Sequence, residues 1–126
     1  MVKKVITVPG APELPFSPAI RAGDYIFVSG QLGHIDAKGR EIKGIEAQTR
    51  RCLESIKGVL TAAGASMDDV VKVTVFLRNE GDFATMNEIY RSYFVKDRPA
   101  RSTVGVNLVL PSMLIEIDCI AYSPAR

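Results

Sequence analysis

Hydrophobic and polar residues alternate along several short stretches of the chain, a pattern that is typical of β-strands. The predicted strands are residues 5–7, 19–21, 25–31, 70–77, 100–106 and 114–122. Residues 70–77 are especially rich in β-branched side chains, which favours a central strand. Gly23 and Asp24 predict a tight turn, so we expect the second and third strands to form a hairpin.

Two other stretches have apolar residues at three- and four-residue spacing, which predicts amphipathic helices. The first covers residues 45–63 and ends at Gly64, where a left-handed C-terminal cap is expected. Ser66 is expected to cap the short turn that follows. The second helix is expected to start at an Asp82 cap and to end before Pro99. The order βββαβαββ predicts an α+β fold, a sheet with two helices packed on one face.

Both faces of the predicted sheet carry apolar residues, although two helices can cover only one face. The strand at 114–122 places Ile115, Ile117, Cys119 and Ala121 on one face and Leu114, Glu116, Asp118, Ile120 and Tyr122 on the other. The strand at 70–77 separates Val71, Val73, Val75 and Leu77 from Val70, Lys72, Thr74 and Phe76. An apolar sheet face without a cover indicates that another copy of the chain packs there.

Composition narrows the class of protein further. With 126 residues, the chain fits a single domain spanning 1–126, and 47% hydrophobic with 24% charged residues is typical of a soluble globular protein. A net charge of +2 is too small for a nucleic-acid-binding surface. No apolar stretch is long enough for a signal peptide or a membrane span, and two cysteines are too few for a disulfide scaffold. We therefore expect a cytoplasmic protein without nucleic-acid or membrane partners.

Few residues suggest metal or cofactor chemistry. His34 has no second histidine to pair with, and neither Cys52 nor Cys119 has a nearby ligand at metal-binding spacing. The glycines do not form a phosphate-binding or dinucleotide-binding pattern. Residues 9–18 contain four prolines, which fits either a cover over a site or a rigid surface link.

Three charged residues on the last two strands are candidates for a binding site. Arg101 can present a fork of donors to a carboxylate, although a surface arginine is the commoner case. Glu116 and Asp118 point to the uncovered face, where carboxylates can hold a water or move a proton. A structural ion pair with Arg21, Lys72 or Arg101 is the simpler alternative.

Several segments, in order, resemble the RidA/YjgF family over nearly the whole chain. They are Tyr25-Ile-Phe-Val-Ser29-Gly30-Gln31, Ala62-Ala-Gly-Ala65, Asp69-Val-Val-Lys-Val-Thr-Val-Phe76, Phe83-Ala-Thr-Met-Asn87, Arg98-Pro-Ala-Arg101-Ser102 and Ile115-Glu-Ile-Asp118-Cys-Ile-Ala121. The resemblance implies a chorismate-mutase-like fold and a homotrimer with clefts between subunits. It also implies an enamine/imine deaminase, a 2-iminobutanoate/2-iminopropanoate deaminase that forms 2-keto acids and ammonia without metal or cofactor.

The resemblance also suggests roles for individual residues. Arg101 resembles the family's clamp for the substrate carboxylate, with the backbone N–H of Thr103 as a second donor. Ser29 and Gly30 are expected to line the cleft, and Asn87 resembles the family's asparagine on the second helix.

Three positions depart from the family pattern. Thr103 stands in place of a frequent cysteine, and Phe16 keeps the ring of the usual tyrosine but lacks its hydroxyl. Asp118 is matched to the family glutamate that positions the water, and it is one methylene shorter. These departures favour an alternative, a non-catalytic protein that binds a small carboxylate such as a 2-keto acid. A ribonuclease or translation inhibitor is the third reading, which the lack of a histidine pair and of a basic groove with aromatic residues disfavours.

Overall fold

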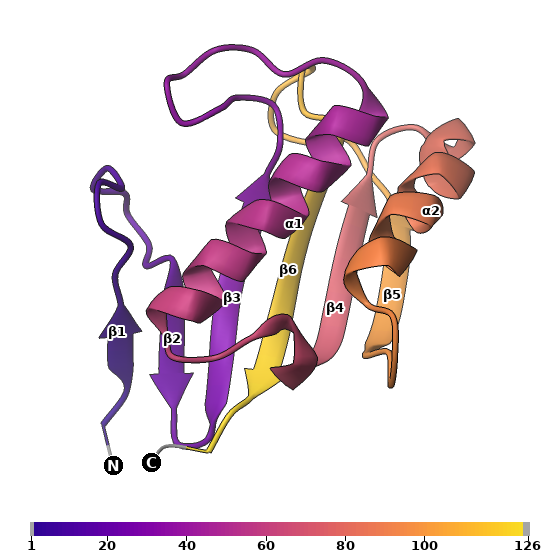
Figure 1. Ribbon diagram of the computed structural model, residues 1–126. Coiled ribbons are helices and arrows are strands. Elements are labelled where there is room, and N and C mark those ends of the chain that lie inside the picture. The colour runs from indigo at the N-terminus through magenta and orange to yellow at the C-terminus, as the bar shows by residue number, and fades with distance from the viewer. Residues whose placement is uncertain (1, 125–126) are drawn as a thin grey trace.

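The computed structural model describes residues 2–124, and one six-stranded sheet backed by two helices dominates it (Figure 1). The strands are β1 (Lys4–Ile6), β2 (Ala19–Ala22), β3 (Tyr25–Leu32), β4 (Val70–Leu77), β5 (Ala100–Gly105) and β6 (Ile115–Tyr122). The helices are α1 (Ile45–Ala62) and α2 (Phe83–Tyr93), with short 3-10 turns at Met67–Asp69 and Glu80–Asp82. The predicted order βββαβαββ is confirmed.

The strands lie in the order β1-β2-β3-β6-β4-β5. Neighbouring strands are antiparallel except for β4 and β5, which run parallel and are joined by a connection that contains α2. The predicted β2–β3 hairpin is confirmed, and Gly23 at its turn has a φ of 62°. The C-terminal strand β6 therefore lies at the centre of the sheet, and β5 forms one edge.

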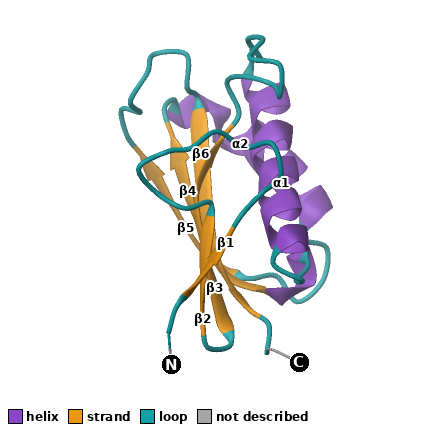
Figure 2. Ribbon diagram, turned by 90° about the vertical axis from the view of Figure 1, so that its left-hand side faces the viewer, coloured by secondary structure: helices purple, strands orange, loops and turns teal. Residues whose placement is uncertain are grey.

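The helices bury their apolar sides against the same face of the sheet (Figure 2). On that face, Ile115 and Ile117 of β6 are fully buried, as are Leu53 and Leu60 of α1. The predicted end of α1 is confirmed, because Gly64 adopts a φ of 79° and the Ala65 N–H donates to the Leu60 carbonyl at 2.8 Å.

Two details differ from the sequence predictions. Asp82 stands at the start of α2, but its side chain makes no capping hydrogen bond, because it is the last residue of the preceding 3-10 turn. Val70, not Val71, faces the core with Val73, because a register shift between Val70 and Lys72 breaks the strict alternation. Val71 is consequently 44% exposed.

The opposite face of the sheet has no helix over it (Figure 2). Tyr25 and Tyr122 are cross-strand partners there with ring centroids 5.3 Å apart, and Phe27 pairs with Ile120. Phe27 is 46% exposed within one chain. We refer to this side as the open face. Among the described helices, none is both long and apolar enough to cross a bilayer.

Candidate functional site

Arg101 lies on the edge strand β5 and points to the helix-covered side of the sheet. Its register partner is the fully buried Val73, which fixes the direction of its side chain. The guanidinium carbon lies 4.6 Å from the centroid of the Tyr90 ring and 5.8 Å from that of Phe83, both on α2. Within residues 2–124, no carboxylate lies within salt-bridge distance of Arg101. The guanidinium is therefore held by ring contacts, which leave its hydrogen-bond donors available to a ligand.

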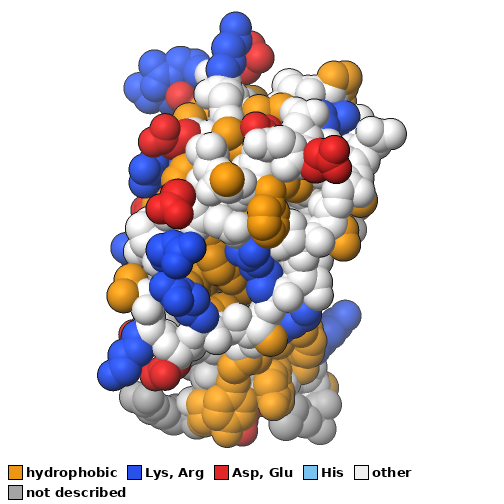
Figure 3. Space-filling view, turned by 90° about the vertical axis from the view of Figure 1, so that its right-hand side faces the viewer, with side chains coloured by type: hydrophobic (Ala, Val, Ile, Leu, Met, Phe, Trp, Pro, Cys, Tyr) orange, Lys and Arg blue, Asp and Glu red, His pale blue; other side chains and the backbone are white. Residues whose placement is uncertain are grey.

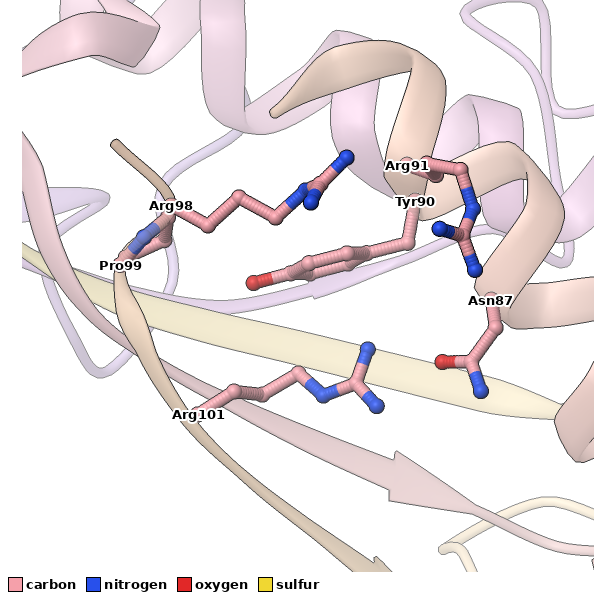
Figure 4. A pocket seen from close by; sticks show the side chains of 6 residues that line it. All are labelled: Asn87, Tyr90, Arg91, Arg98, Pro99 and Arg101. Carbon is pink, nitrogen blue, oxygen red and sulfur yellow. The ribbon is translucent and has the colours of Figure 1, made fainter. Parts of the chain in front are cut away.

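Arg101 lines a hollow of about 310 Å³ between α2 and β5. The residues around it are Asn87, Tyr90, Arg91, Arg98, Pro99 and Arg101, shown in Figure 4. The structure thus brings together Arg101 and Asn87, two of the residues singled out in the sequence. We refer to this hollow as the arginine pocket.

Thr103 lies two residues after Arg101 on the same side of β5. Its hydroxyl is buried and has no hydrogen-bond partner among the described residues. The hydroxyl of Tyr90 is in the same situation, although the Tyr90 side chain belongs to the core. Burial raises the pKa of Tyr90, while the charges of Arg101 and Arg98 act in the opposite direction. Tyr90 is therefore a neutral hydrogen-bonding group at neutral pH.

Glu116 and Asp118 both point to the open face, as the alternation of β6 predicted. Asp118 lies opposite Thr74 on β4. Burial raises the pKa of the Asp118 carboxyl, although a hydrogen bond from Thr74 and the charge of Lys72 act in the opposite direction. Lys72 itself donates to the Ser102 hydroxyl at 2.8 Å. Of the possible ionic partners considered from sequence, Lys72 is thus the one whose charge acts on Asp118. Arg21 instead binds the carbonyls of Ser123 and Ala63, at 2.6 and 3.3 Å.

Glu116 is the carboxylate beside Gly30. A Cβ atom on Gly30 would overlap the Glu116 carboxylate, so a larger residue at position 30 would displace the Glu116 side chain from this place. Burial raises the pKa of the Glu116 carboxyl, and the negative charge of Asp118 raises it further. Asp118 was the residue predicted to match the family's water-positioning glutamate, but Glu116 is the carboxylate that lies next to Gly30, a predicted cleft residue. The contact between Gly30 and Glu116, which distinguishes Glu116 from Asp118, is visible only in the folded structure.

Ser29 and Gly30 form an irregularity in β3, where the pairing with β6 shifts between Val28 and Gln31. The Ser29 hydroxyl donates to the Ser17 carbonyl at 2.6 Å. This bond ties β3 to the end of the proline-rich segment, where Phe16 is 57% exposed. Phe16, Ser29, Gly30 and Glu116 therefore gather on the β3–β6 side of the molecule.

The predicted site residues thus form two groups that one chain does not bring together. Arg101, Thr103 and Asn87 lie at the β5 edge on the helix-covered side, whereas Asp118 lies on the open face. Strands β3 and β5 are three positions apart in the sheet, which separates Gly30 from Arg101 by about 14 Å at a strand spacing of about 4.8 Å. A small substrate cannot contact both groups of residues within one chain.

The described residues offer no metal centre. Nowhere in residues 2–124 do three His, Cys, Asp or Glu side chains gather closely enough to hold a metal ion. Neither Arg91 nor Arg98 was predicted as a site residue, although Arg98 begins one of the segments that resemble the family. Each is an exposed arginine at its own position, and only the packing of α2 against β5 brings them beside Arg101.

The fold defines a small α+β protein of the chorismate-mutase-like type. A sequence profile of the family described as "Endoribonuclease L-PSP" matches residues 7–123. A RutC family protein of Pyrococcus horikoshii is 47% identical over 124 residues, covering 96% of this chain and 98% of its own.

Two further similarities link the chain to named proteins. "Reactive Intermediate Deaminase A, chloroplastic" of Arabidopsis thaliana is 41% identical over 122 residues, covering 94% of this chain and 65% of its own length. A solved structure described as a putative endoribonuclease from Thermotoga maritima superposes with a TM-score of 0.89 at 41% identity, covering 98% of this chain and all of its own. The chain belongs to the RidA/YjgF family, which the L-PSP profile represents.

Proposed function

We propose that this protein is a deaminase that hydrolyses 2-imino acids, and their enamine tautomers, to 2-keto acids and ammonia. The observation that carries the proposal is the unpaired Arg101 guanidinium, held against Tyr90 with its donors available. Such a planar fork suits the carboxylate that every 2-imino acid has next to its reactive carbon. The Arabidopsis relative named reactive intermediate deaminase supports this activity.

The proposed active site lies between two subunits of a homotrimer. The β5 edge of one subunit would supply Arg101, Thr103 and Asn87, and the neighbour would supply Gly30 with Glu116. The opposite orientation of these two groups and the exposed Phe27 on the open face support an assembly of this kind. Association would cover the apolar side chains and complete the site in one step.

The proposed reaction needs only a carboxylate clamp and one proton acceptor from the protein. Arg101 holds the substrate carboxylate, which fixes the imine carbon in the cleft. A water molecule adds to the carbon of the protonated imine, the C=N π electrons move to the nitrogen, and a carboxylate accepts the water proton, giving a neutral carbinolamine. The resulting carboxylic acid returns this proton to the nitrogen, which leaves as ammonia while the C–N bond breaks. The carbinolamine hydroxyl loses its proton to the ammonia as the C=O bond forms. We assign the proton acceptor to Glu116 because it adjoins Gly30, and we treat Asp118, the residue chosen from sequence, as the rival assignment.

A coupled assay tests the activity. A PLP-dependent lyase that releases 2-aminoacrylate or 2-aminocrotonate is run with and without this protein, and keto-acid appearance is followed. We expect faster keto-acid formation with the wild type and the uncatalysed rate with Arg101→Ala. Binding of 2-oxobutanoate without any acceleration would instead establish the non-catalytic carboxylate-binding alternative.

The assembly has its own test. Mass photometry at decreasing protein concentration is expected to show a trimer. A stable monomer at high concentration would contradict both the homotrimer and the shared site.

A further inference from the structure

We propose that the arginine pocket selects dicarboxylic substrates, so that the preferred imine carries a second carboxylate on its side chain. This inference rests on the proposed function, because Arg101 is taken to hold the carboxylate next to the imine. The new element is the pair Arg98 and Arg91, which lines the same hollow.

The arginine pocket carries an excess of positive charge. Three of the six lining residues are arginines, which stay charged at every pH of interest, and none of the six is acidic. Among residues 2–124, the one acidic contact of these three arginines is an Arg91–Glu88 pair at 3.8 Å, in which both side chains are more than half exposed. Such an exposed pair neutralises little. One substrate carboxylate would balance only one of the three positive charges.

The Arg98 side chain is oriented by a hydrogen bond that leaves donors available to a ligand. The Nε of Arg98 donates to the Phe94 carbonyl at 2.7 Å, which orients the side chain. No other hydrogen bond of the Arg98 guanidinium occurs within the described residues, so its terminal nitrogens remain available. Figure 4 shows Arg98 and Arg101 on opposite sides of the Tyr90 ring, with Arg91 and Asn87 projecting from α2.

The shape of the arginine pocket also favours a short dicarboxylic ligand. Figure 3 shows the edge of the molecule, where Lys and Arg side chains flank a depression with an apolar floor. Tyr90 lies between the guanidiniums of Arg98 and Arg101, and its buried hydroxyl has no partner among residues 2–124. A short dicarboxylic acid that passes along the edge of the Tyr90 ring, with one anionic group at each guanidinium, complements this arrangement. The volume of about 310 Å³ suits a small organic acid.

The test compares two stable ligands of matched shape. One is 2-oxoglutarate, and the other is 5-methyl-2-oxohexanoate, in which an isopropyl group replaces the second carboxylate. Isothermal titration of the wild-type protein is expected to show at least about tenfold tighter binding of 2-oxoglutarate, the effect of a charged hydrogen bond. Equal affinity for the two ligands would overturn this inference while leaving the proposed function intact. Failure to bind either ligand would overturn both.

Variants of Arg98 and Arg91 test which side chain binds the second carboxylate of 2-oxoglutarate. Arg98→Gln is expected to remove most of the preference by weakening 2-oxoglutarate about tenfold, with binding of the branched ligand unchanged. Arg98→Lys retains the charge and is expected to keep part of the preference, and Arg91→Gln should reduce it less because Glu88 lies nearby. Arg40→Gln, which removes an exposed arginine paired with Asp36 in another loop, is the charge-matched control.

A competing explanation is that an acidic residue of a neighbouring subunit fills the pocket. In that case 2-oxoglutarate has no advantage in the wild-type trimer, and Arg98→Gln weakens the trimer in mass photometry. That combination of results would overturn the proposal. A preference for 2-oxoglutarate that persists in Arg98→Gln, Arg91→Gln and the double variant would overturn it as well.

Discussion

The two faces of the sheet differ in how far their side chains are buried within one chain. Under the helices, Val75 and Ile117 are fully buried within one chain. On the open face, Phe27 is nearly half exposed, and Glu116 and Asp118 are half-buried. One face therefore stabilises the fold of the monomer, whereas the other carries the groups that we assign to assembly and catalysis. Substitutions on the two faces should have different consequences.

The largest expected effect comes from the covered face. Ile117→Ala should lower the free energy of unfolding by about 2–5 kcal/mol, because it leaves a cavity in a closely packed core. Ile120→Ala, three residues along on the open face, should cost less and should shift trimer dissociation to higher protein concentration. Urea unfolding and mass photometry on both variants measure the difference. Equal losses of stability with unchanged association would remove the distinction between the faces.

Arg101 provides the next test, at the edge where the two faces meet. Arg101→Ala should weaken 2-oxobutanoate binding by about 10- to 150-fold, the range expected for a hydrogen bond to a charged group. The adjacent Ser102→Ala is the matched control, since Ser102 faces the open side and contacts Lys72. Titration calorimetry measures both. Unchanged affinity in Arg101→Ala would exclude it as the carboxylate clamp.

Glu116 and Asp118, the two carboxylates of the open face, allow the two candidate proton acceptors to be compared within one strand. Glu116→Gln should lower turnover by about 10²-fold with keto-acid binding retained, because it removes the proposed proton acceptor. Asp118→Asn should lower it less than tenfold, and Asp118→Glu should not raise it. Turnover, keto-acid affinity and trimer content are measured for each variant. The reverse order of effects would return the proton acceptor to Asp118.

The smallest expected effect concerns pH. The folded protein raises the pKa of Glu116 through burial and the charge of Asp118, so ionisation of Glu116 costs stability. Below pH 4.5, the ordinary pKa of a glutamate, Glu116 is protonated in both the folded and the unfolded chain, and the ionisation cost is absent. Above the raised pKa of the folded protein the cost is complete, so the free energy of unfolding falls as pH rises between these two values. Urea unfolding between about pH 4 and about pH 7 should show a smaller fall for Glu116→Gln than for the wild type. The same pH dependence of stability in both proteins would mean that folding does not raise the pKa of Glu116.

Local patterns were sufficient for most of the fold. The spacing of apolar residues identified both helices, and alternation placed Glu116 and Asp118 together on the open face, because side-chain direction in a regular element depends only on sequence position. The same rule failed at Val70 and Val71, where the pairing with β6 shifts register. Such an irregularity depends on the partner strand and leaves no trace in the local pattern.

The sequence by itself determined the family, the order of elements and the presence of an uncovered sheet face. Only the tertiary structure decided that Arg101 and Asp118 lie on opposite sides of the sheet, and that Glu116 adjoins Gly30. It also decided that Arg91 and Arg98 share a hollow with Arg101. These are contacts between residues distant in sequence or on different elements. They depend on strand order and on helix packing, which no local spacing of residues encodes.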